Sequence, residues 1–187
     1  MAERLIGMLI FPRLTQLDMT GPYEVLARLP NTKVHLVAHT MAPVKTDRGM
    51  EIVPTITLAD CPQLDLVCVP GGAGMNPLME DAETLAFLKK QAAGARYVTS
   101  VCTGALALAK AGLLRNRPAT TWWGRLDRLA ELEPTVEVRP DDRFVDSGEI
   151  ITAAGVSAGI DMALHLVARL HSVERAREVR RYIQYDH

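Results

Sequence analysis

The sequence predicts an α/β fold in which a doubly wound, mostly parallel sheet is flanked by helices. Short apolar runs alternate along the chain with longer segments whose apolar residues recur at helical spacing. The run at 64–72 is apolar at almost every position before it ends in glycines, which is typical of a parallel strand covered on both faces. A chain of 187 residues is long enough for one layered domain, so we predict a single domain over residues 1–187.

The first third of the chain predicts a βαβ unit. Apolar strands at 4–11 and 33–39 enclose a helix that we expect to begin at Pro22, because proline is favoured at the first helical position. A small hairpin is predicted at 44–54, around a turn of polar residues and glycine. The buried strand at 64–72 follows it. Parallel strands joined by helices then account for this part of the sequence.

The remaining chain continues the alternation and ends in two helices. The expected elements are a helix at 81–95, a strand at 97–101, helices at 103–114 and 124–132, strand pieces between 135 and 155, and helices at 157–170 and 172–185. Ser172 is a good N-cap for the last of these. In a doubly wound sheet the ligand crevice lies at the carboxyl ends of the strands. Functional residues are therefore expected where strands end.

Composition excludes several classes of function. The chain has 21 basic and 22 acidic residues with no basic run, so direct binding to nucleic acid or to an anionic membrane is not expected. No apolar stretch approaches the roughly 20 residues that cross a bilayer, and the first residues do not resemble a secretory signal. We therefore expect a cytoplasmic protein. The spacing of cysteines and histidines predicts neither a disulfide framework nor a metal site, and no cofactor is expected.

Cys102 stands at the junction between the strand at 97–101 and the next helix. Ser100 two residues before it and Gly104 two residues after it are small, as a nucleophile elbow requires. At the start of a helix the dipole is expected to lower the pKa of the thiol. Cys102 is thus the candidate nucleophile, whereas Cys68 is interpreted as a core residue and Cys61, beside Pro62 in a turn, is expected to have no special role.

A glycine-rich turn follows the buried strand at 64–72. The backbone N–H groups of Gly71 and Gly72 can approach a ligand closely, and with the N–H of Thr103 they could form an oxyanion hole. The same residues are also common in ordinary turns. The turn alone therefore leaves both interpretations open.

Asp18 lies between apolar residues at the entry to the first helix. One interpretation is a helix cap, because aspartate is a preferred capping residue. The other is a carboxyl group that points into the crevice. Apolar surroundings would then raise its pKa and make it a proton donor and acceptor beside Cys102.

Five segments together resemble the ThiJ/PfpI superfamily, and within it the isonitrile hydratase-like subgroup. They are FPRLTQLDMTGPYEVLARLP, DLVCVPGGAG, YVTSVCTGALALAKAGLL, ATTWW and AAGVSAGIDMALHLVARL, and the resemblance covers essentially the whole chain. It implies a flavodoxin-like, glutamine-amidotransferase-like sandwich that acts on a small molecule as a homodimer. The site residues that it implies are Cys102 as nucleophile, Asp18 as partner carboxyl group, and Thr103, Gly71 and Gly72 as polar and backbone donors. We also expect Trp122 and Val156 to form the pocket wall.

The sequence departs from the superfamily at two places where other members carry a histidine. Thr103 follows the cysteine directly, and Trp122 occupies the second place. This disfavours reactions that need a histidine base and fits a cysteine working with a carboxyl group. The resemblance thus implies hydration of an isonitrile to an N-substituted formamide through a thioimidate on Cys102. A ligand-sensing domain of an AraC-type regulator and a cysteine-dependent glyoxalase or redox-stress protein remain alternatives.

Overall fold

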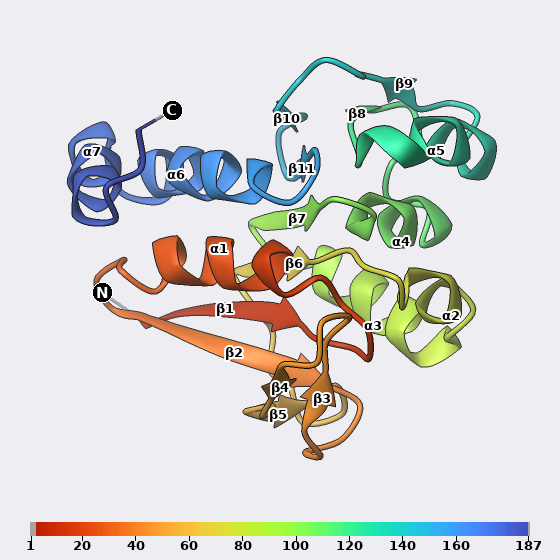
Figure 1. Cartoon of the computed structure of the whole chain (residues 1–187), viewed down its shortest axis with the longest axis horizontal. Helices are drawn as coiled ribbons and strands as arrows, with labels where there is room; N and C mark the ends of the chain where they lie inside the picture. The colour runs from red at the N-terminus through yellow and green to blue at the C-terminus, as the bar shows by residue number, and fades with distance from the viewer. Residues whose placement is uncertain (1–2, 187) are drawn as a thin grey trace.

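The computed structural model describes residues 3–186 and confirms the α/β prediction (Figure 1). One seven-stranded sheet has the order β10-β11-β7-β6-β1-β2-β5, and all its neighbouring strands are parallel except the pair β10 and β11. Its strands are β1 (Arg4–Leu9), β2 (Thr32–Ala38), β5 (Ile56–Thr57), β6 (Leu66–Val69), β7 (Tyr97–Val101), β10 (Phe144–Asp146) and β11 (Ile150–Ala153).

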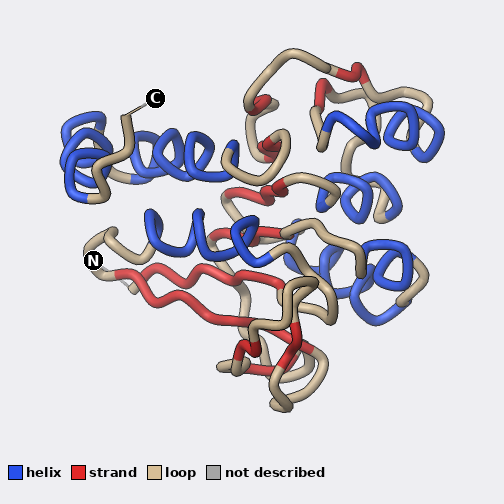
Figure 2. The backbone as a smooth tube through the Cα atoms, in the orientation of Figure 1, coloured by secondary structure: helices blue, strands red, loops and turns tan. Residues whose placement is uncertain are grey.

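Two groups of helices cover the two faces of the sheet, as the tube in Figure 2 shows. One group is α1 (Gln16–Leu26), α6 (Ala158–Leu170) and α7 (Val173–Tyr182); the other is α2 (Met75–Met79), α3 (Ala82–Ala92), α4 (Gly104–Lys110), the 3-10 turn η1 (Trp123–Arg125) and α5 (Leu126–Leu132). Two small strand pairs complete the chain. They are the antiparallel hairpin of β3 (Val44–Lys45) and β4 (Glu51–Ile52), and the parallel pair of β8 (Pro118–Ala119) and β9 (Glu137–Val138).

The central strands form the core. Every residue of β6 and β7 is buried, which explains why the sequence is apolar there at almost every position. Cys68 lies in β6, and Cys61 is buried in the loop before it. Burial raises the pKa of the Cys61 thiol to about 11 and that of the Cys68 thiol to about 12. The interpretation of Cys68 as a core residue is confirmed, and Cys61, expected in a turn, is buried as well.

The first helix starts earlier than predicted. α1 begins at Gln16, so the expectation that Pro22 occupies the first helical position is wrong. Pro22 lies inside the helix, where it lacks the N–H that would bond to the carbonyl of Asp18. The buried residues Met19, Pro22 and Val25 nevertheless follow helical spacing and belong to the face that packs near α6. This packing outweighs the unfavourable proline and places Asp18 in the first turn.

Other differences concern short elements. β5 and α2 were not predicted, because a strand of two residues and a helix of five residues carry too little periodicity to be recognised. α4 ends at Lys110 instead of 114. Gly112, with φ of +76°, follows its end in the left-handed conformation that commonly terminates helices.

Gly104 allows α4 to start directly against β6, and its replacement tests this contact. A Cβ atom at this position would lie 2.0 Å from the carbonyl oxygen of Val69, a backbone atom that cannot move away alone. We expect Gly104→Ala to lower the free energy of unfolding by at least about 2 kcal/mol. Urea unfolding followed by circular dichroism measures this change.

Gly21→Ala is the matched control. Gly21 lies inside α1, and its added methyl would first meet the flexible side chain of Ile160 at 3.0 Å. Alanine also favours the helix by about 1 kcal/mol relative to glycine, so this variant should lose much less stability. Equal losses in the two variants would contradict the proposed role of Gly104.

Candidate active site

Cys102 occupies a strained turn between β7 and α4. Its φ of +55° lies in the left-handed region that residues with side chains rarely adopt. The Cys102 N–H donates to the carbonyl of Ala154 at 2.9 Å, and the Cys102 carbonyl accepts from the Thr121 hydroxyl at 2.7 Å. These two bonds hold the turn from both sides. The geometry is that of the predicted elbow, with the thiol at the carboxyl end of a central strand.

The glycine-rich turn after β6 packs directly against this elbow. A Cβ on Gly71 would lie 2.5 Å from the Thr103 nitrogen and 3.0 Å from Cys102 Cβ, so only glycine fits. The Gly71 N–H donates to Asp18 Oδ2 and the Gly72 N–H donates to Thr103 Oγ1, both at 3.0 Å. The two amides thus hold Asp18 and Thr103 in place. An oxyanion role for Gly71 and Gly72 stays a prediction, and it would require these bonds to be exchanged.

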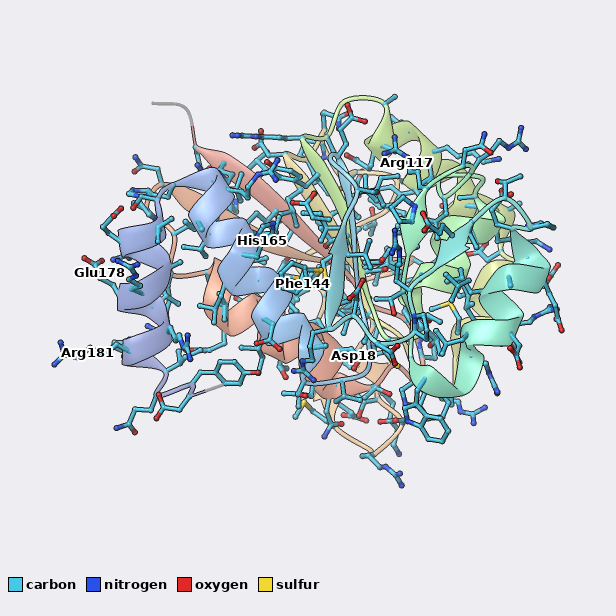
Figure 3. All side chains as sticks on the ribbon, turned by 90° about the horizontal axis from the view of Figure 1, so that it is seen from above. Asp18, Arg117, Phe144, His165, Glu178 and Arg181 are labelled. Carbon is cyan, nitrogen blue, oxygen red and sulfur yellow. The ribbon has the colours of Figure 1, made fainter. Side chains whose placement is uncertain are left out.

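Asp18 is buried in the crevice and does not cap its helix. Thr15 is the N-cap of α1, and the Asp18 side chain is fully buried. Its Oδ1 receives no N–H from residues 3–186, and the Cys102 thiol is the group that hydrogen-bonds with the carboxyl besides Gly71. Burial raises the pKa of Asp18 from 3.8 to about 7, although the Gly71 N–H opposes the shift. Figure 3 shows Asp18 inside the molecule, whereas Glu178 and Arg181 project outward from α7.

The pKa of the Cys102 thiol is raised, whereas the sequence predicts that it is lowered. Burial, followed by the nearby charge of Asp18, raises the pKa of the thiol to about 12. Hydrogen bonds from the backbone N–H groups of Thr103 and Val156 lower it, but they are outweighed. The prediction that the start of α4 would depress this pKa is therefore wrong, because burial and a neighbouring carboxylate are stronger than the dipole of a short helix. The sulfur rests as a thiol beside the group that can accept its proton.

A cavity of about 510 Å³ opens over Cys102, and Thr103, Trp122 and Val156 line it. The Trp122 ring is wedged between two glycines. A Cβ on Gly124 would lie 2.5 Å from the ring, and one on Gly155 would lie 2.7 Å from it. The indole is therefore fixed as an apolar wall, the position predicted for Trp122.

Several further residues of the site were not predicted. Thr121 holds the elbow, although the sequence assigned no role to it. Asp47 and Arg48 were interpreted only as a hairpin turn, and Arg125 as part of a helix, yet all three line the cavity. No sequence signal joins the segments that carry them, which lie far apart in the chain. Among residues 3–186, no three histidine, cysteine or acidic side chains gather where they could hold a metal ion.

A mostly parallel sheet with a strained cysteine elbow and a buried carboxyl group beside it defines a class of α/β proteins that carry a cysteine at the carboxyl end of a central strand. The chain belongs to the DJ-1/PfpI family, whose sequence pattern matches residues 4–169. It is 51% identical over 181 residues to an isonitrile hydratase from Pseudomonas putida, which covers 96% of this chain and 78% of that protein.

Two other relatives extend the comparison. The HTH-type transcriptional regulator GbdR from Pseudomonas aeruginosa is 29% identical over 97% of this chain, which spans 50% of the regulator. A crystal structure of a ThiJ/PfpI family protein from Pseudomonas syringae superposes with a TM-score of 0.94 at 39% identity, covering 100% of this chain and 77% of the other. Drosophila melanogaster DJ-1beta shares the fold, with a TM-score of 0.88 at 23% identity.

The raised pKa of Asp18 predicts a specific dependence of stability on pH. The folded protein holds the Asp18 proton up to about pH 7, whereas the unfolded chain releases it near 3.8. Between these values the folded state binds more protons, so the free energy of unfolding falls as pH rises, by at most about 1.4 kcal/mol per pH unit from this group. Below and above the window Asp18 contributes no further change.

Urea unfolding of the wild type and Asp18→Asn across this pH range measures the contribution. The difference in unfolding free energy between the two proteins should shift steadily against the wild type as pH rises through the window. Asp141→Asn, at an exposed turn, is the control and should keep the wild-type slope. A difference that is flat with pH, or that grows in favour of the wild type, would contradict the raised pKa of Asp18.

The Thr121 bond to the elbow is tested with its neighbour as control. Thr121→Val keeps the shape but leaves the Cys102 carbonyl without this donor, and we expect a loss of about 1 to 3 kcal/mol in unfolding free energy. Thr120→Val removes an equally buried hydroxyl that has no hydrogen-bond partner, so it should be neutral or stabilising. Thr121→Ser should restore most of the loss. Equal effects of the two valine variants would exclude the role of Thr121.

Proposed function

We propose that the protein hydrates isonitriles to N-substituted formamides. The observation that carries this proposal is the buried pair of Cys102, which lines the cavity, and Asp18, which hydrogen-bonds with it. No histidine of residues 3–186 lines this cavity, and Asp18 is the carboxyl group that hydrogen-bonds with the thiol. Isonitrile hydration needs one nucleophile and one proton carrier, and the 51% identity to an isonitrile hydratase supports the assignment.

The first half of the reaction forms a thioimidate. The terminal carbon of an isonitrile accepts a nucleophile while it also needs a proton. Asp18, as carboxylate, takes the proton of the Cys102 thiol as the sulfur bonds to that carbon. The resulting carboxylic acid then gives the proton to the same carbon. One S–C bond and one C–H bond form, and the carbon–nitrogen triple bond becomes a double bond.

The second half of the reaction consumes one water. The oxygen of the water molecule adds to the thioimidate carbon while Asp18 takes a proton from that water, and Asp18 then gives this proton to the nitrogen. The new hydroxyl then gives its proton to Asp18 as the carbonyl forms and the S–C bond breaks. The leaving sulfur meets the N–H groups of Thr103 and Val156 and recovers its proton from Asp18. The formamide is released, and both groups return to their starting states.

The pKa values suit this division of labour. With a pKa of about 7, Asp18 can both accept and donate a proton near neutral pH, which is where a general acid and base works best. A thiol with a pKa of about 12 does not ionise alone, so it reacts when the carboxylate removes its proton during attack. The nucleophile is thereby generated only when an electrophile is present.

The alternative functions have weaker support. Oxidation sensing and trapping of reactive aldehydes favour an exposed cysteine with much thiolate, and Cys102 is buried with a raised pKa. A ligand-sensing role is supported by the 29% identity to the regulator GbdR, half of which this chain spans. A sensing domain would bind its ligand without turnover, so an activity assay separates it from a hydratase.

The proposal also covers the location, the kind of ligand and the oligomeric state of the protein. No helix within residues 3–186 is both long and apolar enough to cross a membrane. We propose that the protein works in the cytoplasm, on a small molecule, as a homodimer. Light scattering coupled to size-exclusion chromatography tests the dimer.

Incubation with cyclohexyl isonitrile tests the reaction. We expect N-cyclohexylformamide, detected by mass spectrometry, with oxygen-18 incorporated from labelled water. Cys102→Ala should abolish formation of the product, and Asp18→Asn should lower kcat by at least about a hundredfold because it cannot carry a proton. Acid quenching of the wild type should reveal an adduct on Cys102 with the mass of one isonitrile.

Cys61→Ala provides the matched control, since Cys61 lies outside the cavity. It should keep wild-type turnover and the adduct on Cys102. Turnover in Cys102→Ala, or no formamide from the wild type, would overturn the proposal.

A further inference from the structure

Two arginines from distant parts of the chain reach the same cavity. Arg48 lies in the turn between β3 and β4, and Arg125 lies in η1. Both residues are exposed, whereas Cys102 is buried, so they mark the open end of the cavity and the thiol marks its floor. Two positive charges therefore stand over one small-molecule site.

Neither guanidinium is engaged by an acidic group. Within residues 3–186, the Arg48 side chain makes no hydrogen bond or ion pair, and Arg125 donates only to the carbonyl of the adjacent Gly124, at 3.1 Å. Asp47, which neighbours Arg48 in the chain, instead accepts from the Thr15 hydroxyl at 3.0 Å. Guanidinium groups bind a carboxylate strongly when two N–H donors act on it together.

Two arginines elsewhere in the molecule show the alternative, a guanidinium that binds a carboxylate of the protein itself. Arg143 binds Asp161, and Arg169 donates to Asp146 at 2.6 Å. Within residues 3–186, Arg48 and Arg125 have no such acidic partner. Arg48 and Arg125 carry two positive charges and Asp47 one negative charge, so the open end has one positive charge in excess. A monoanionic group balances that excess, whereas a phosphate dianion would exceed it.

Apolar side chains form part of the lining between the two ends. Trp122 forms the fixed wall, and Met75, Leu106 and Val156 also line the cavity. A ligand that fills it would place its reacting carbon at Cys102, an apolar skeleton along Trp122 and an anionic group at the arginines. Building on the proposed function, we propose that the substrates of this site are isonitriles that carry a carboxylate at the end remote from the isonitrile group.

A matched substrate pair tests this specificity. trans-4-Isocyanocyclohexanecarboxylate and its neutral carboxamide have nearly the same shape, and the saturated ring separates the charge from the reacting carbon. In the wild type, kcat/KM for the carboxylate should exceed that for the carboxamide by about tenfold or more, and added salt should reduce this ratio. In Arg48→Gln/Arg125→Gln the ratio should fall to about one, because the carboxylate loses its partners.

Arg128→Gln is the matched control, since Arg128 lies on α5 outside this cavity and is paired with Glu131 at 3.0 Å. It should keep the wild-type ratio. A wild-type ratio of one or below, or a ratio that survives in the double variant, overturns the proposal. Turnover of the carboxamide reports on hydration itself, so a failure of specificity is distinguishable from a failure of the proposed reaction.

A second measurement does not depend on hydration. 6-Maleimidohexanoate and its neutral amide alkylate thiols at one end and differ in charge at the other. Mass spectrometry of the Cys102 peptide should show an excess rate for the carboxylate that disappears in Arg48→Gln/Arg125→Gln. Equal rate ratios in the wild type and the double variant would overturn carboxylate binding at the arginines, whether or not isonitriles are hydrated.

Discussion

Asp18 and Cys102 are buried against each other, and the negative charge of the Asp18 carboxylate makes ionisation of the Cys102 thiol harder. Burial raises the pKa of Asp18 to about 7, although hydrogen bonds from the Gly71 N–H and the Cys102 thiol oppose this shift. Burial, followed by the charge of Asp18, raises the pKa of Cys102 to about 12. Most of the local architecture serves this contact. The early start of α1 brings in the carboxyl group, the Gly71 N–H fixes its orientation, and the elbow presents the sulfur. The Cys102 sulfur therefore keeps its proton at rest, and Asp18 lies beside it as the group that can accept this proton.

Close backbone approaches make that contact possible. Gly104 lets α4 begin against β6, and Gly71 lets the turn after β6 lie on the elbow. The left-handed conformation of Cys102 is unfavourable by about 1 to 3 kcal/mol, so surrounding bonds must keep it. The Thr121 hydroxyl and the Ala154 carbonyl supply them from segments that follow Cys102 in the chain. The strained residue is therefore stabilised only once the sheet and its later loops have assembled.

Local patterns in the sequence predicted the parts of the structure that depend on neighbouring residues. The small residues around Cys102 indicated the elbow, and the continuous apolar run indicated β6. The start of α1 was misplaced because packing near α6 overrode the usual position of a proline. The pKa of Cys102 was misjudged because burial and a partner from another segment decide it. Arg48 and Arg125 could not be predicted as neighbours, since only tertiary folding joins them.

The wedging of Trp122 has a consequence for how this cavity can change. The Trp122 ring fits between Gly124 and Gly155 because neither residue has a side chain, and neither glycine lines the cavity itself. One methyl group added at either glycine would tilt the indole and alter the shape of the cavity without replacing any group that contacts the bound molecule. The range of substrates can therefore change through substitutions at Gly124 and Gly155 while Cys102 and Asp18 remain the same. Gly124 and Gly155 thus determine the orientation of Trp122. Other residues at these two positions in relatives would change the shape of the cavity and leave its chemistry unchanged.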